Sequence, residues 1–202
     1  MANSKLKEMP IRVSPLLPAD GDYIVDYTEL QLQERKSLTA IQVLAYAGSY
    51  EPVAIAIGKA LGIDCPVTPG NYGANDHTQI IWNGPNSWMI IGSDEESGRK
   101  PGELAKTLEK AVGEQAAVVD QSHGRCGLRL GGKNARAVMA KNCAIDLHPC
   151  AFKAGNCALT SVAHMSALVV QLDDTPCYDL YVARSLARSF AHAIEHACAE
   201  FA

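Results

Sequence analysis

Apolar residues recur along the chain in two patterns. A spacing of three to four residues predicts helices, and short apolar or alternating runs predict strands. Residues 50–61 carry apolar side chains at every fourth position, with Pro52 in the first turn and Gly62 after the last, which predicts a helix. The same spacing predicts helices over residues 103–112, 134–141 and 186–201, the last with Ser185 as its N-cap. Short apolar runs, some with alternation, predict strands over residues 38–47, 79–82, 88–91, 116–120, 127–130, 158–164, 168–172 and 178–182.

The N-terminal part differs because prolines interrupt it. Residues 9–19 contain Pro10, Pro15 and Pro18, which remove backbone donors and disfavour helix, so residues 1–36 are expected to form an extended arm. Pairs of strands then alternate with helices in two similar halves, residues 37–115 and residues 116–202, which together make one compact unit. This order predicts the α+β class, with antiparallel sheets and helices packed on one face.

Composition and charge narrow the possible functions. The 202 residues are 48% hydrophobic and 20% charged, which suits a globular protein. The formal net charge is −4 and the basic residues are scattered, which argues against nucleic-acid binding. No apolar run is long enough to span a membrane and no secretory signal is visible. Seven cysteines without a CxxC pair suit buried thiols in the reducing cytoplasm, where we expect the protein.

Two groups of residues resemble metal ligands. His192-Ala-Ile-Glu195-His196 matches the inverted zinc-protease pattern, but the two histidines lie on the Arg188 side of the predicted helix, away from its apolar stripe. Cys143, His148, Cys150 and Cys157 could hold a structural zinc, although their spacing matches no ordinary zinc motif. The alternative for this second group is buried thiols beside a hydrogen-bonded histidine. We therefore predict no metal in this chain.

The segment Ser122-His123-Gly124-Arg125-Cys126 contains nucleophilic residue types, but side chains three apart at the start of a strand diverge, so no catalytic residue is predicted. Gly124 and Gly127 are expected to allow unusual backbone angles. Arg125 is expected to bind a carboxylate, with Asp120 or Asp146 as partner. No glycine-rich cradle for a dinucleotide occurs, and the Gly-Gly-Lys-Asn stretch at 131–134 is interpreted as a turn and helix cap.

Residues 120–189 resemble the gamma subunit of heterotetrameric sarcosine oxidase. The resemblance rests on several short motifs in the same order. They are Ser122-His-Gly-Arg125 leading into Leu128-Arg-Leu130, Asn134-Ala-Arg136, Ala144-Ile-Asp-Leu-His-Pro149, Phe152, Gly155-Asn-Cys-Ala-Leu-Thr160 and Tyr181-Val-Ala-Arg-Ser185. The N-terminal half adds Gly84-Pro85-x-x-Trp88, so the resemblance extends over most of the chain.

This resemblance implies a subunit of a complex that oxidatively demethylates sarcosine to glycine. Its products would be hydrogen peroxide and either 5,10-methylenetetrahydrofolate or formaldehyde. FAD, FMN, NAD and tetrahydrofolate would be held by the alpha and beta subunits, and zinc by the delta subunit. The gamma subunit is similar to the folate-binding lobe of the glycine cleavage T-protein, which is also built from two related α+β halves, but no cofactor is assigned to it.

We therefore expect a non-catalytic structural subunit with alpha, beta and delta partners and no cofactor of its own. Its structural or interface residues are expected to be His123, Gly124, Arg125, Asp146, His148, Phe152, Arg184 and Ser185. Three alternatives stay open. One is a stand-alone folate-binding or aminomethyltransferase-like protein, one is a subunit of a related N-methyl amino acid oxidase or dehydrogenase, and one is a zinc-stabilised binding module.

Overall fold

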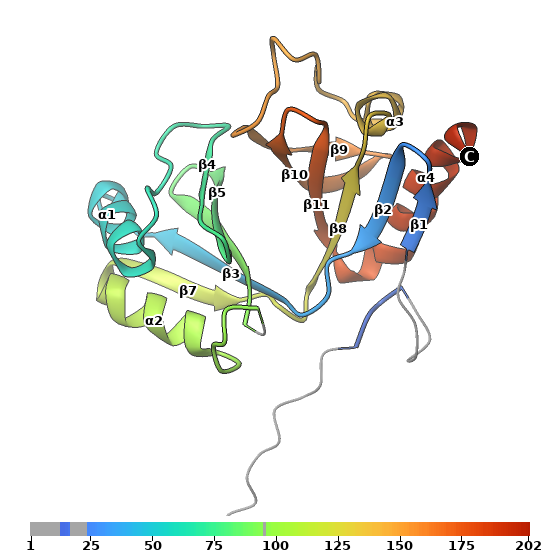
Figure 1. The fold of residues 1–202 in the computed structure, drawn as a ribbon. Helices are drawn as coiled ribbons and strands as arrows, with labels where there is room; N and C mark the ends of the chain where they lie inside the picture. The colour runs from blue at the N-terminus through green and yellow to red at the C-terminus, as the bar shows by residue number, and fades with distance from the viewer. Residues whose placement is uncertain (1–12, 17–23, 95) are drawn as a thin grey trace, which may run out of the picture.

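Two antiparallel sheets face each other, and helices cover the outer face of each (Figure 1). A computed structural model describes residues 13–16, 24–94 and 96–202. The layers run in the order helices, sheet, sheet, helices, which confirms the predicted α+β class with helices on one face of each antiparallel sheet.

The larger sheet has six strands in the order β1-β2-β8-β11-β10-β9. The strands are β1 (Ile24–Tyr27), β2 (Leu30–Glu34), β8 (Arg125–Gly131), β9 (Cys157–Val162), β10 (Met165–Asp173) and β11 (Cys177–Ala183). Helices α3 (Ala135–Asn142) and α4 (Ala187–Cys198) pack on its outer face. Leu128 and Leu130 of the sheet meet Val138 of α3 and Phe190 of α4 in the same buried cluster.

The smaller sheet has five strands in the order β4-β5-β6-β3-β7. The strands are β3 (Leu38–Ala45), β4 (Tyr72–Ala74), β5 (Thr78–Gly84), β6 (Ser87–Ser93) and β7 (Ala116–Asp120). Helices α1 (Tyr50–Leu61) and α2 (Glu103–Val112) cover its outer face. Ile57 and Leu108 of these helices pack against Ile41, Ile90 and Trp88 of the sheet.

A third apolar cluster lies between the sheets. Leu38, Ala40, Ile81, Met89 and Ile91 of the five-stranded sheet meet Cys157, Leu168, Val170 and Tyr181 of the six-stranded one. The central strands are therefore buried on both faces. Each large apolar side chain that leaves water contributes roughly 1.5–3 kcal/mol, so this layered core is the main source of stability.

The four predicted helices and eight predicted strands are all present, with shifts of a few residues at their ends. Strands β1, β2 and β4 were not predicted. Ser185 does not cap the last helix, which is a correction. It is exposed in a short 3-10 turn, Arg184–Leu186, and α4 starts only at Ala187, with Leu186 in the cap position.

The division into an N-terminal arm and two halves stays a prediction. The two sheets do not follow its boundaries, because strands of different predicted segments pair with each other. β7 was placed in the second half, yet it pairs with β3 in the five-stranded sheet. β1 and β2 fall in the predicted arm, yet β2 pairs with β8. Most of the proline-rich stretch 9–19 lies outside the described residues. Within the described part, the Ser14 hydroxyl bonds to the Glu34 carboxylate.

Candidate functional site

A buried carboxylate lies between the two sheets on β11. Tyr178 and Leu180 point to the helices, so the strand alternation turns Asp179 and Tyr181 towards the opposite sheet. The Asp179 side chain is fully buried, with 0% exposed. A buried charge is costly unless it is paired and hydrogen-bonded, so its partners decide what this position can do.

Two arginines pair with Asp179. Arg129 stands directly opposite it in the β8–β11 register and donates through Nε (2.8 Å) and Nη2 (2.9 Å), one bond to each carboxylate oxygen. Arg35, which follows β2, donates from Nη1 to Oδ2 at 2.7 Å. The bidentate contact of Arg129 with Asp179 is stronger and geometrically more specific than a single arginine–carboxylate bond.

Tyr181 and Gln79 extend these contacts to the other sheet. The Tyr181 hydroxyl accepts a bond from Arg35 Nη1 at 2.6 Å. Its own proton can go to Gln79 Oε1 at 2.9 Å or to Asp179 Oδ2 at 3.1 Å. Gln79, on β5, donates to Asp179 Oδ2 at 3.3 Å. We refer to Asp179, Arg35, Arg129, Tyr181 and Gln79 as the Asp179 cluster.

Electrostatics make this cluster a rigid arrangement rather than an acid–base pair. Burial, with Asp179 close by, raises the pKa of Tyr181 well above its usual value. The hydrogen bonds to Asp179 raise the pKa of Arg129. General acid–base catalysis works best with groups that titrate near the working pH, and neither side chain does. The cluster can position groups and bind ligands, but it is poorly suited to transfer protons.

Two neighbouring cavities, with four lining residues in common, open beside the cluster. A pocket of about 210 Å³ is lined by Arg35 and Arg129 together with Tyr72, Asp76, Gln79 and Glu96. A shallower one of about 510 Å³ shares Arg35, Asp76, Glu96 and Arg129 with it. The Arg35 and Arg129 side chains are 19% and 34% exposed, so they border these cavities, whereas the Asp179 side chain is not exposed to solvent.

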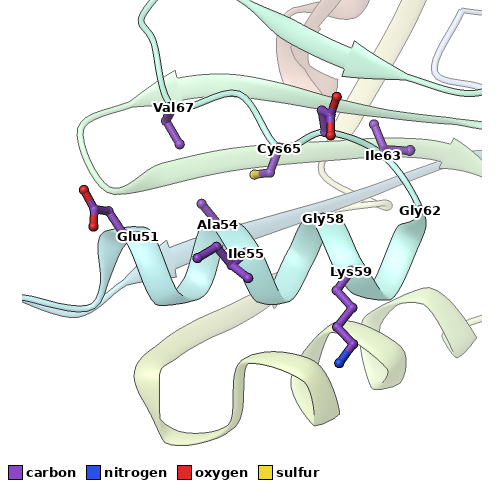
Figure 2. A pocket seen from close by; sticks show the side chains of 10 residues that line it. Glu51, Ala54, Ile55, Gly58, Lys59, Gly62, Ile63, Cys65 and Val67 are labelled. Atoms are coloured by element: carbon purple, nitrogen blue, oxygen red, sulfur yellow. The ribbon is translucent and has the colours of Figure 1, made fainter.

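A larger and more apolar groove of about 840 Å³ lies on the far side of the five-stranded sheet, between α1 and the segment that follows it (Figure 2). Ile55, on α1, is 70% exposed, and Val67, across the groove, is 53% exposed. Burial raises the pKa of Cys65 to about 12, so this thiol stays protonated at neutral pH and is a poor nucleophile. We call this surface the α1 groove.

The first group of expected interface residues is brought together by the pairing of β8 with β11. Arg125 stands opposite Ala183, and the Arg184 N–H donates to the Gly124 carbonyl at 2.8 Å. His123 and Ser185 are exposed on either side of this contact. These five residues therefore share one end of the six-stranded sheet. That they contact other subunits stays a prediction.

Two expectations about this turn were wrong. Arg125 donates from Nε to Gln121 Oε1 at 2.9 Å, whereas the carboxylates of Asp120 and Asp146 accept bonds from the backbone N–H groups of Ser122 and His148. Neither Gly124 nor Gly127 has a positive φ. Gly127 faces the Tyr181 ring, and an added Cβ would lie 3.1 Å from it, so this glycine provides space rather than an unusual backbone angle.

The second group, Asp146, His148 and Phe152, lies in the loop between α3 and β9 at the opposite end of the sheet (Figure 1). Asp146 accepts a bond from the His148 N–H at 2.8 Å, and His148 Nδ1 accepts one from the Cys150 N–H at 3.2 Å. Phe152 is buried in the core beneath α3 and α4. The structure thus brings these three residues together but separates them from the first group.

The possible nucleophile and metal ligands are placed apart. The Ser122 hydroxyl is buried and accepts a bond from the Ala40 N–H at 3.0 Å, while His123 is exposed. Cys157 lies in the core between the sheets, whereas Cys150 is on the surface. His192 and His196 are exposed on α4. Within residues 13–16, 24–94 and 96–202, no three histidine, cysteine or acidic side chains gather as metal ligands do.

The Asp179 cluster was missed in the sequence. Its signal was a charged residue in the middle of an apolar strand, at 178–182, where both neighbours on the chain are buried. None of the helices that the structure describes has the length and apolar character needed to cross a membrane.

Comparison with known proteins agrees with the resemblance. The family model of the sarcosine oxidase gamma subunit matches residues 47–200. The chain is 31% identical to sarcosine oxidase subunit gamma of Corynebacterium sp. (strain P-1), covering 86% of this chain and 82% of that one. It is 35% identical to sarcosine oxidase subunit gamma of Arthrobacter sp., covering 74% and 70%.

Two solved structures have a similar fold. A chain of heterotetrameric sarcosine oxidase from Corynebacterium sp. U-96, in complex with pyrrole 2-carboxylate, aligns with a TM-score of 0.75 and 26% identity over 88% of both chains. The glycine cleavage system aminomethyltransferase T from Bartonella henselae aligns with a TM-score of 0.58 and 14% identity, over 83% of this chain and 46% of that one. This second likeness concerns the fold alone.

Proposed function

The chain belongs to the sarcosine oxidase gamma subunit family, and on that basis we propose that it is a non-catalytic structural subunit of a heterotetrameric sarcosine oxidase. The observation that carries the proposal is its alignment, over 88% of both chains, with a chain of such a complex. The complex would demethylate sarcosine to glycine, with hydrogen peroxide and 5,10-methylenetetrahydrofolate or formaldehyde as products.

The chemistry of the Asp179 cluster supports a non-catalytic role. Both oxygens of the Asp179 carboxylate accept bonds from guanidinium groups, and the side chain is fully buried, so a substrate cannot reach it. The Tyr181 phenol keeps its proton because burial raises its pKa. FAD, FMN, NAD, tetrahydrofolate and zinc would then belong to the alpha, beta and delta partners.

The α1 groove is the surface that best suits a contact with one of these partners. An exposed apolar groove with a charged rim is typical of interaction sites. The carboxylates of Glu51 and Asp64 border it, with the single positive charge of Lys59 beside them. Neither carboxylate forms an ion pair with another residue of the described part. Its occupant would therefore be a partner segment that carries an apolar side chain next to a lysine or arginine.

The subunit role can be tested by producing the full chain alone and together with alpha-, beta- and delta-type subunits. Alone, it should show no flavin absorbance and no sarcosine-dependent oxygen uptake. Together, it should elute with the other three subunits in one active complex. Sarcosine oxidation by the lone chain would overturn the non-catalytic role, and an active complex that excludes this chain would overturn the subunit role.

A further inference from the structure

The Asp179 cluster carries one more positive charge than negative. Arg35 and Arg129 share the single carboxylate of Asp179. Among the described residues, no other carboxylate lies within ion-pair distance of either guanidinium. Removing charges from water without a partner is unfavourable, so a half-buried positive excess next to a cavity favours an anionic group there.

The two guanidinium groups are already oriented for such a group. Arg129 is fixed by two bonds to Asp179, and Arg35 is fixed by bonds to Asp179 and Tyr181. These bonds use two of the five N–H donors of each arginine, so the remaining donors, on a planar group already held in place, can meet a carboxylate with little loss of entropy. The same two side chains line both cavities.

Acidic side chains line both cavities together with the two arginines, and Lys36 lines the wider cavity as well. Asp76, in the turn before β5, and Glu96, in the loop after β6, line both cavities and are exposed. Neither forms an ion pair within the described part of the chain. These carboxylates would repel a simple anion such as phosphate, but they would attract an ammonium group on a ligand whose carboxylate meets the arginines.

From this arrangement we propose that the cavity between Arg35, Arg129, Asp76 and Glu96 binds a small zwitterionic amino acid. The ligand carboxylate would meet the two guanidinium groups, and its ammonium group would face Asp76 and Glu96. The inner pocket of about 210 Å³ has room for a ligand with few heavy atoms, while the wider cavity lets it enter. No bond is made or broken, so the site is one of binding only.

Thermal unfolding of the full chain with glycine or sarcosine tests this site. A ligand that binds only the folded state raises the melting temperature, by about 2–4 °C once its concentration exceeds Kd severalfold. Acetate and methylammonium, which each supply half of the zwitterion, should have much smaller effects at equal ionic strength. No shift with either amino acid up to tens of millimolar would overturn the proposal, as would an equal shift with acetate.

The double variant Asp76→Asn/Glu96→Gln distinguishes this site from a plain anion site. Both side chains are exposed, so the variant should fold, whereas Arg35→Gln could fail to fold because it breaks the Asp179 cluster. Calorimetry should show glycine affinity reduced by roughly tenfold or more and acetate affinity increased. Unchanged glycine affinity in the double variant would refute the assigned orientation. Binding in this cavity does not require the other subunits, so failure here leaves the subunit role standing.

Discussion

The Asp179 carboxylate accepts hydrogen bonds from side chains of both sheets, so its removal should weaken the contact between them. We expect Asp179→Asn to lower the free energy of unfolding by roughly 3 kcal/mol, because two guanidinium groups lose their counter-charge in a half-buried place. The partial exposure of both arginines limits the loss. Urea denaturation followed by circular dichroism measures it.

The matched control is Asp26→Asn on the edge strand β1, where the carboxylate is exposed. This change should stay within about 0.5 kcal/mol of the parent. If Asp179→Asn were as stable as Asp26→Asn, the Asp179 cluster would contribute nothing to holding the sheets together, and the pre-oriented arginines of the proposed amino-acid site would lose their physical basis.

Buried thiols give the protein a defined response to alkaline pH. Burial raises the pKa of Cys126 and of Cys157 to about 12. Above pH about 9 the unfolded chain therefore releases protons that the folded chain keeps. The stability that these thiols contribute is fully present below about pH 9 and should fall as pH rises, by at most about 1.4 kcal/mol per pH unit for each thiol.

Urea denaturation at pH 8, 9 and 10 should show this decline, and Cys126→Ala/Cys157→Ala should make it shallower even though the variant is less stable overall. Cys150→Ala, which removes an exposed thiol, should keep the slope of the parent. Equal slopes for the double variant and the parent would show that other groups cause the loss.

The connection between β8 and α3 depends on Gly132. Its φ is +111°, and an added Cβ would lie 2.4 Å from the Glu29 carbonyl oxygen. Gly132→Ala should therefore cost roughly 3 kcal/mol or more, or prevent folding. Gly98→Ala is the control, because Gly98 also has a positive φ (+68°) but open space around it. It should cost about 1–2 kcal/mol in the same denaturation measurement, and a similar cost at both positions would rule out the backbone clash.

Elements with a strong repeating pattern could be predicted from the sequence, and edge elements could not. The helix at Tyr50–Leu61 was predicted with its bounds, because its apolar spacing and the glycine at 62 agree. β1 and β2 were missed because they lie in a polar stretch, where Leu30 and Leu32 are buried in the core and Val25 and Tyr27 only pack against its edge. β4 was missed because three residues in a loop rich in proline and glycine carry no periodicity.

The candidate site could not be predicted because it depends on long-range pairing. Arg35 and Asp179 are 144 positions apart in the chain, and Gln79 and Asp179 are 100 apart. Only the β8–β11 register and the packing of one sheet on the other bring them together. The turn residues from His123 to Arg125 could be recognised as a unit, since their contact with Arg184 follows from one strand pair.

At the scale of the whole molecule, the layers separate two kinds of surface. The space between the sheets is closed by apolar side chains and by the Asp179 cluster, whose polar cavities open at its border. Helix α1 lies on the other face of the five-stranded sheet, outside this layer (Figure 1), and the α1 groove lies beside it (Figure 2). Changes in the groove should therefore affect association with other subunits without disturbing the core.

Assembly tests this separation. Ile55→Asp places a charge on an exposed position of the α1 groove beside two carboxylates, so it should leave folding intact but reduce recovery of the chain with its partner subunits by tenfold or more. Leu159→Asp is the control, because Leu159 is an equally apolar, 53% exposed residue on β9, away from the groove. Size-exclusion chromatography of the co-produced subunits measures recovery, and circular dichroism confirms folding. Normal assembly of Ile55→Asp would exclude the groove as a subunit contact, and equal loss in both variants would show that any new surface charge disrupts the complex.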